Sequence, residues 1–72
     1  MNTTTTVKKL RYEQRVVVTD NGDPDDPYTG ILGTVNNFSR WRSGWIYEVW
    51  LDSPVRGRHI AQFREDELEA AA

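Results

Sequence analysis

The residues with the greatest chemical potential in this chain are the tryptophans and arginines between positions 40 and 58. Indole rings and guanidinium groups dominate interface hot spots, and they also stack on the bases of nucleic acids. We therefore predict that a partner binds to six residues, which we call the Arg/Trp set: Arg40, Trp41, Arg42, Trp50, Arg56 and Arg58.

A protein is the first class of partner that suits this set. Another protein, or a second copy of the chain, would bury Trp41 and Trp50 as anchors. Arg40 and Arg42 would then pair with carboxylates at the rim of the interface. This hypothesis predicts that both indoles face solvent in an isolated copy.

Single-stranded nucleic acid is the alternative partner. Its bases would stack on the same indoles, and its phosphates would contact Arg56, Arg58 and Lys8 or Lys9. The net charge is −2 and the sequence pI is about 5.2. Because nucleic-acid-binding domains usually carry a basic excess, the charge favours a protein partner.

The aromatic residues also have a purely structural interpretation. A small chain with few aliphatic residues needs large side chains to fill its core, so we expect Trp45, Tyr47 and Phe63 to be buried. Trp41 falls in a predicted loop, and Trp50 falls on the outer face of a predicted strand. Packing therefore does not account for these two indoles.

We predict no catalytic site, no metal site and no cofactor. The sequence has no nucleophile elbow, P-loop, Rossmann or H-E-x-x-H motif, and His59 is its only histidine. The acidic segment 20–28 suggests calcium, but a calcium loop starting at Asp20 needs a glycine where Asp25 stands and a glutamate where Ile31 stands. We expect a solvated loop there.

Length and composition indicate one small domain. The chain has 72 residues and no cysteine, so its stability depends on packing and strand pairing alone. A chain without cysteine suits a reducing cytoplasm. No apolar run is long enough for a membrane span, and the N-terminus lacks the apolar region of a signal peptide. We therefore expect a soluble, cytoplasmic protein.

Strand periodicity defines the elements that must position the Arg/Trp set. Residues 15–19, 30–36, 45–51 and 58–63 have the β-branched or alternating patterns of strands. Gly33 is expected to allow a bulge or a close backbone approach, and residues 37–44 are predicted to form a loop. Residues 64–69 predict a helical or 3₁₀ turn that buries Leu68, followed by a short fifth strand or a tail.

These elements predict an all-β fold, a small barrel of four to five antiparallel strands with a short helical turn before the last element. Closing a small sheet into a barrel hides its edges. We expect a flexible N-terminal tail at residues 1–9, a barrel at residues 10–69 and a C-terminal tail at residues 70–72.

The order of the motifs resembles the SH3-like barrels of small bacterial and plastid proteins. These include KOW-type ribosomal and transcription modules, the small stromal photosystem I subunit of the PsaE type, and the variable chain of ferredoxin-thioredoxin reductase. The matching positions in the KOW-type G-x-x-G-x-V element are Gly30, Gly33 and Val35. Those in the closing F-x-x-D-E-L turn are Phe63, Asp66, Glu67 and Leu68. The resemblance implies the fold of residues 15–69, since such barrels serve unrelated functions.

A more distant resemblance, to the plasmid-type dihydrofolate reductase, implies an enzyme. That protein is a similarly small SH3-like barrel that forms its active pore as a homotetramer, with a V-Q-I-Y segment before its terminal turn. The corresponding segment here is Ile60-Ala61-Gln62-Phe63. Its glutamine is displaced by one position, hence to the opposite face of the strand, and phenylalanine replaces the tyrosine. We therefore expect no reductase activity.

Taken together, the residues and the resemblance lead us to expect a noncatalytic SH3-like binding module, either an accessory subunit or a self-associating protein, from a bacterium or its mobile elements. A KOW-like nucleic-acid-binding module is the alternative, and a homotetrameric reductase is the third hypothesis.

Overall fold

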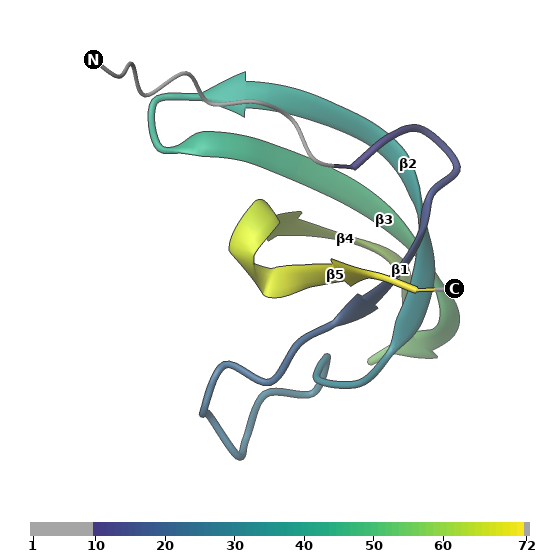
Figure 1. Cartoon of the computed structure of the whole chain (residues 1–72). Coiled ribbons are helices and arrows are strands. Elements are labelled where there is room, and N and C mark those ends of the chain that lie inside the picture. Colours follow the sequence, from purple (N-terminus) through teal and green to yellow (C-terminus); the bar gives the residue numbers. More distant parts are fainter. Residues whose placement is uncertain (1–9, 72) are drawn as a thin grey trace.

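Five antiparallel strands form a single sheet in the computed structural model, which describes residues 10–71 (Figure 1). The elements are β1 (Arg15–Val18), β2 (Leu32–Trp41), β3 (Gly44–Val55), β4 (Arg58–Arg64), the 3₁₀ turn η1 (Glu65–Glu67) and β5 (Leu68–Ala70). The prediction of an all-β fold with four to five antiparallel strands and a short helical turn before the last element is confirmed.

The strand order is β4-β3-β2-β1-β5, so the last strand returns to pair with the first. The long β2 and β3 are strongly curved, and β4, η1 and β5 lie on the concave side of the curve (Figure 1). The sheet continues past the expected boundary at residue 69, because β5 includes Ala70 and the Ala71 N–H donates to the Arg15 carbonyl at 2.8 Å. The expected tail at residues 1–9 lies outside the described residues.

The concave face of the sheet carries the hydrophobic core. Along β1 and β3, buried residues alternate with less buried ones, as a sheet with one solvated face requires. Tyr47, Phe63 and Leu68 are buried as predicted, and Trp45 is half-buried against them. The remaining buried residues are Leu10, Val16, Val18, Val35, Val49, Leu51 and Val55.

Gly33 lies where β2 and β3 leave no room for a side chain. A Cβ atom at this position would lie 2.5 Å from Val49 Cγ1 and 2.6 Å from the Trp50 carbonyl oxygen. The close backbone approach expected at Gly33 is therefore confirmed. The irregularity in the β2–β3 ladder comes slightly later, between Val35 and Asn37.

The predicted loop at residues 37–44 is wrong. β2 continues to Trp41 and β3 begins at Gly44, which leaves a turn of two residues. The extension holds because Phe38 packs against Tyr12 with ring centroids 4.4 Å apart and against Trp45 at 5.8 Å. Aromatic cross-strand contacts stabilise a hairpin even where the intervening residues are polar.

The turn between β3 and β4 holds a non-glycine residue in the left-handed conformation. Arg56 has a φ of 52° and Gly57 a φ of 79°, the pattern of a type I′ turn. Asparagine accepts this conformation more readily than arginine does. We expect Arg56→Asn to raise the free energy of unfolding by about 1 kcal/mol in urea denaturation, while Arg58→Asn gives no gain. Equal stability of the wild type and Arg56→Asn would contradict this expectation.

None of the helices among the described residues is long and apolar enough to cross a membrane.

Candidate interaction surface

The convex face of β3 presents Trp50 to solvent. On this strand Tyr47, Val49 and Leu51 point inward, so Trp50 points outward, and 49% of its surface is exposed. Its ladder partners are Thr34 on β2 and Ile60 on β4.

Two further apolar side chains lie beside this indole. Ile60 stands directly opposite Trp50 and is 38% exposed. Leu32 is 44% exposed and lies two residues from Thr34, which makes it a diagonal neighbour of Trp50. We call Leu32, Trp50 and Ile60 the outer patch.

An ion pair on the same face joins three strands next to the outer patch. Arg15 Nη1 donates to Thr34 Oγ1 at 2.9 Å and to Asp52 Oδ1 at 2.8 Å, and Arg15 Nη2 pairs with Asp52 Oδ2. The hydrogen bond from Arg15 lowers the pKa of the Asp52 carboxyl below its ordinary value of 3.8, and the arginine charge acts in the same direction. The pair thus connects β1, β2 and β3 at the edge of the patch.

The lowered pKa of Asp52 makes stability depend on pH. Because the folded-state pKa lies below the unfolded one, the pair stabilises the fold above the ordinary value of 3.8, and this contribution is lost as the pH falls through the folded-state pKa. The effect is small, since both side chains are nearly half exposed. Urea unfolding from about pH 6 to pH 2 should therefore show a steeper acid loss in the wild type than in Asp52→Asn. Parallel profiles would contradict this.

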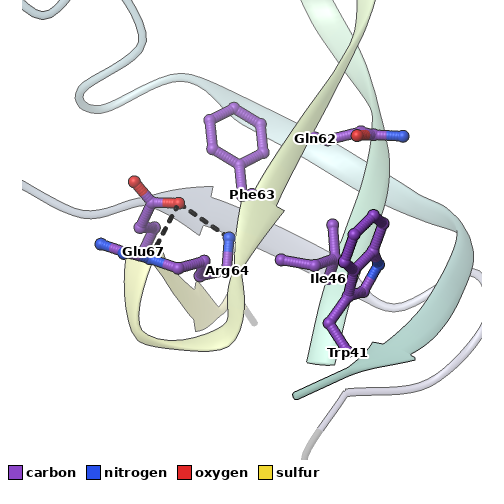
Figure 2. Close-up of a pocket in the computed structure, with 6 residues that line it drawn as sticks. All are labelled: Trp41, Ile46, Gln62, Phe63, Arg64 and Glu67. Atoms are coloured by element: carbon purple, nitrogen blue, oxygen red, sulfur yellow. Dashed lines mark hydrogen bonds and ion pairs between the residues drawn. The ribbon is translucent and has the colours of Figure 1, made fainter. Parts of the chain in front are cut away.

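Trp41 lies at the end of β2 and is 61% exposed. Its indole Nε1–H donates to Ser39 Oγ at 3.0 Å, which holds the ring on the outer face. The ring borders a pocket of about 290 Å³, whose lining residues are Trp41, Ile46, Gln62, Phe63, Arg64 and Glu67 (Figure 2).

Figure 2 shows Trp41 and Ile46 next to each other on one side of this pocket, with Arg64 and Glu67 on the other. The Arg64 backbone N–H donates to Glu67 Oε1 at 2.7 Å, and the Arg64 side chain lies 3.5 Å from Asp66 Oδ1. The apolar wall of the pocket is therefore free for a ligand, while its charged wall is already paired.

All six residues of the Arg/Trp set are exposed, but they lie in two groups. Arg40, Trp41 and Arg42 lie at the β2–β3 turn, where Arg40 pairs with Trp45 in the ladder and so faces away from Trp41. The second group, Trp50, Arg56 and Arg58, lies toward the β3–β4 turn.

These two groups are far apart on the sheet. The two turns stand at opposite ends of β3, a strand of 12 residues, hence roughly 35 Å of extended chain. Polar residues separate Trp41 from Trp50 on the outer face. Among them, Asn36 Nδ2 donates to Glu48 Oε1 at 2.6 Å. The single continuous surface implied by the sequence is therefore divided. Lys8 and Lys9, the other expected phosphate contacts, fall outside the described residues.

Sequence reasoning missed Leu32 and Ile60 in the outer patch, and Ile46 and Gln62 at the pocket. The alternation that placed Trp50 outward also places Ile46 outward, and Leu32 precedes the inward Gly33, so a period-two signal was present for both. No sequence signal brings Trp41 next to β4, because that contact depends on how far the hairpin extends.

The acidic loop between β1 and β2 satisfies its own backbone. Asp20 and Asp23 side chains accept the N–H groups of Gly22 at 2.8 Å and Asp25 at 2.9 Å, which are Asx turns. Within residues 10–71, no group of three or more His, Asp or Glu side chains could hold a metal ion.

Comparisons with protein-family models, with curated proteins and with solved structures found no match. The function of the chain is therefore inferred from its own residues.

Proposed function

We propose that this protein is a noncatalytic SH3-like barrel that binds another protein through the outer face of β3. The observation that carries the proposal is the exposure of Trp50, at 49%, within an apolar outer patch while a separate core is complete on the other face. Burying a large apolar side chain contributes about 1.5–3 kcal/mol, so an apolar cluster left in solvent marks a docking surface. Trp41 provides a second anchor at the hairpin end.

The strand order and the 3₁₀ turn between β4 and β5 support the SH3-like assignment. A single curved sheet whose last strand returns to the first suits a barrel of this kind. Such a module has no catalytic machinery of its own, and it acts as an accessory subunit in a bacterial cytoplasm.

The distribution of charge favours a protein over a nucleic acid. Arg42 and Arg56 stand at opposite ends of β3, so the arginines do not form one basic track along which a phosphate backbone could run. Glu48 lies on the outer face between them, and the net charge is −2. The KOW-like alternative therefore has weaker support.

A reductase in the manner of the plasmid enzyme has weaker support still. Gln62 is exposed on the outer face, whereas Phe63 is buried on the inner face. A pore would need the glutamine and a tyrosine from this segment, and here the two positions point in opposite directions. No residue of the chain is therefore assigned a catalytic role.

Affinity capture with matched variants tests the protein-binding function. Immobilised wild-type chain and Tyr12→Phe should retain the same partner, and Trp50→Ser should lose it while its circular dichroism shows that it remains folded. Tyr12→Phe is a suitable control because Tyr12 is 59% exposed and lies away from the outer patch, and the substitution keeps its ring against Phe38. Equal capture by Trp50→Ser would contradict the proposal.

Two solution measurements distinguish the other hypotheses. Binding of a generic single-stranded oligonucleotide that weakens steeply with salt would support the nucleic-acid module instead. Sedimentation equilibrium of the wild type and Trp50→Ser tests whether a second copy covers the outer patch.

A further inference from the structure

β4 is an edge strand with a free side. It stands at one end of the strand order, and its seven residues make it longer than the other edge strand, β5, which has three. Most of its side chains are exposed, and it contains no proline. An unprotected edge of this length presents backbone donors and acceptors on which another strand can form.

The hydrogen bond of Arg64 reveals which residues face that free edge. The Arg64 N–H donates to Glu67 Oε1 at 2.7 Å, so it points away from β3, and the Ile46–Arg64 pair is a non-hydrogen-bonded pair of the ladder. Pair types alternate along an antiparallel ladder, so Gln62 and Ile60 belong to the same class as Arg64. Their N–H and C=O groups therefore point to the free edge.

The backbone N–H and C=O groups of Ile60 and Gln62 have no hydrogen-bonding strand beside them in the described part of the chain. Neither Ile60 nor Gln62 takes part in a backbone hydrogen bond outside the strand ladders of residues 10–71. The edge thus offers two N–H and two C=O groups in the spacing that one added strand requires.

Two sites that could bind side chains of an added strand lie next to this edge on the outer face. The pocket of about 290 Å³ between Trp41, Ile46 and Arg64 borders the C-terminal half of β4 (Figure 2). The outer patch borders the N-terminal half of β4 through Ile60. An added strand would direct alternate side chains toward these two sites. Apolar residues at alternate positions of the partner are therefore required.

The charges at the two ends of β4 determine which end of the partner segment should be acidic. Arg58 is the first residue of β4 and Arg56 lies in the turn before it, and neither is in an ion pair among the described residues. The opposite end of β4 runs into η1, whose three residues are all acidic. An acidic residue is thus favoured beside Arg58 and disfavoured beside η1.

We propose that β4 is a docking edge, to which an extended segment of a partner protein adds as a further strand, with alternating apolar side chains and an acidic end beside Arg56 and Arg58. The inference rests on the protein-binding function proposed above. A second copy suits the edge less well, because antiparallel pairing of two β4 strands about Ala61 places Arg58 opposite Arg64 twice, and like charges across a ladder repel.

A designed peptide tests the proposal on the full chain. The probe is the peptide acetyl-Thr-Val-Thr-Leu-Thr-Val-Asp-Asp. It is compared with the same peptide N-methylated at the alternate residues whose N–H groups would face β4, and with a form in which Lys-Lys replaces the final Asp-Asp. We expect saturable binding by the first peptide, at least about tenfold weaker binding by the N-methylated form, and weaker binding by the lysine form. Absence of saturable binding at about 1 mM, or equal binding of the N-methylated peptide, would overturn the proposal.

Amide hydrogen exchange reports the docking edge directly. In the free protein, the Ile60 and Gln62 amides should exchange rapidly, while the Ala61 and Phe63 amides are protected by β3. Added peptide should protect Ile60 and Gln62. If these two amides were already protected in a concentration-dependent manner without peptide, a second copy would be the occupant and the proposal would be wrong.

Proline substitutions separate the edge from the outer patch. Gln62→Pro removes an edge-facing N–H and leaves the β3 ladder intact, so the variant should fold and lose peptide binding by at least about tenfold. Ala61→Pro removes a ladder N–H and should unfold the protein. If Gln62→Pro also fails to fold, the N-methylated peptide still decides the question.

Comparison with Trp50→Ser keeps the two proposals distinct. Loss of the natural partner in Trp50→Ser together with unchanged partner and peptide binding in folded Gln62→Pro would leave the protein-binding function in place and refute the docking edge. Equal partner capture by Trp50→Ser would instead count against the proposed function itself.

Discussion

Gly33→Ala is expected to lower the free energy of unfolding by about 3 kcal/mol, the upper range for overpacking a core. The added methyl group would lie 2.6 Å from the Trp50 carbonyl oxygen and 2.5 Å from Val49 Cγ1. A side chain can rotate away, but the carbonyl belongs to a strand that is paired on both sides. Relief therefore requires β2 and β3 to separate, which disturbs the core beneath them. A small domain has a total stability of only about 5–15 kcal/mol, so this is a large fraction.

Urea denaturation of Gly33→Ala, Val49→Ala and the double variant tests the cause of this loss. Removing the Val49 methyl groups takes away one of the two short contacts, so the double variant should recover part of the Gly33→Ala loss beyond additivity. The carbonyl contact remains, so recovery should be incomplete. A loss below about 1 kcal/mol for Gly33→Ala would show that the strands separate easily, contrary to this account.

Tyr47→Ala is expected to destabilise the protein by about 3–5 kcal/mol, as for other buried aromatic residues. Tyr47 is completely buried, and its ring lies 6.1 Å from that of Phe38. Its hydroxyl donates to Glu65 Oε2 at 2.5 Å and accepts the Leu10 N–H at 3.4 Å. One side chain thus connects β3, η1 and the start of the described chain.

Tyr47→Phe distinguishes the contribution of the ring to stability from that of the hydroxyl group. It keeps the packing and removes the two polar contacts, so we expect a loss of about 1–2 kcal/mol. Thermal and urea unfolding of both variants give the two contributions. Equal losses of stability in Tyr47→Phe and Tyr47→Ala would mean that the ring packing contributes little to stability. Wild-type stability of Tyr47→Phe would mean that the hydroxyl contacts contribute nothing to it.

These core variants and the outer-face variants should affect different properties. Tyr47 and Trp50 lie on the same strand but on opposite faces, three residues apart. Tyr47→Ala should lower stability and leave the outer patch chemically unchanged, whereas Trp50→Ser should remove partner binding with a smaller loss of stability, because only part of its indole is buried. A protein whose two faces are independent in this way can change its binding surface without losing its core.

The sequence alone determined the composition of both faces of β3. Its alternation placed Tyr47 inward and Trp50 outward, because successive side chains of a strand point to opposite faces. It also predicted a bulge or a close backbone approach at Gly33, of which the structure shows the close approach, and the burial of Leu68 after the 3₁₀ turn. These features depend on neighbours in the chain and on a period of two.

Tertiary structure decided the length of the β2–β3 hairpin and the arrangement of the site. Local polarity at residues 37–44 predicted a loop, but Phe38 packs against Tyr12, which is distant in the sequence, and this contact extends both strands. The extension carries Trp41 away from Trp50 and toward β4, where it borders the pocket. Likewise, the Arg64–Glu67 hydrogen bond, a tertiary feature, identifies the free edge groups of β4. Which residues meet across strands depends on register and on long-range packing, and a one-dimensional pattern specifies neither.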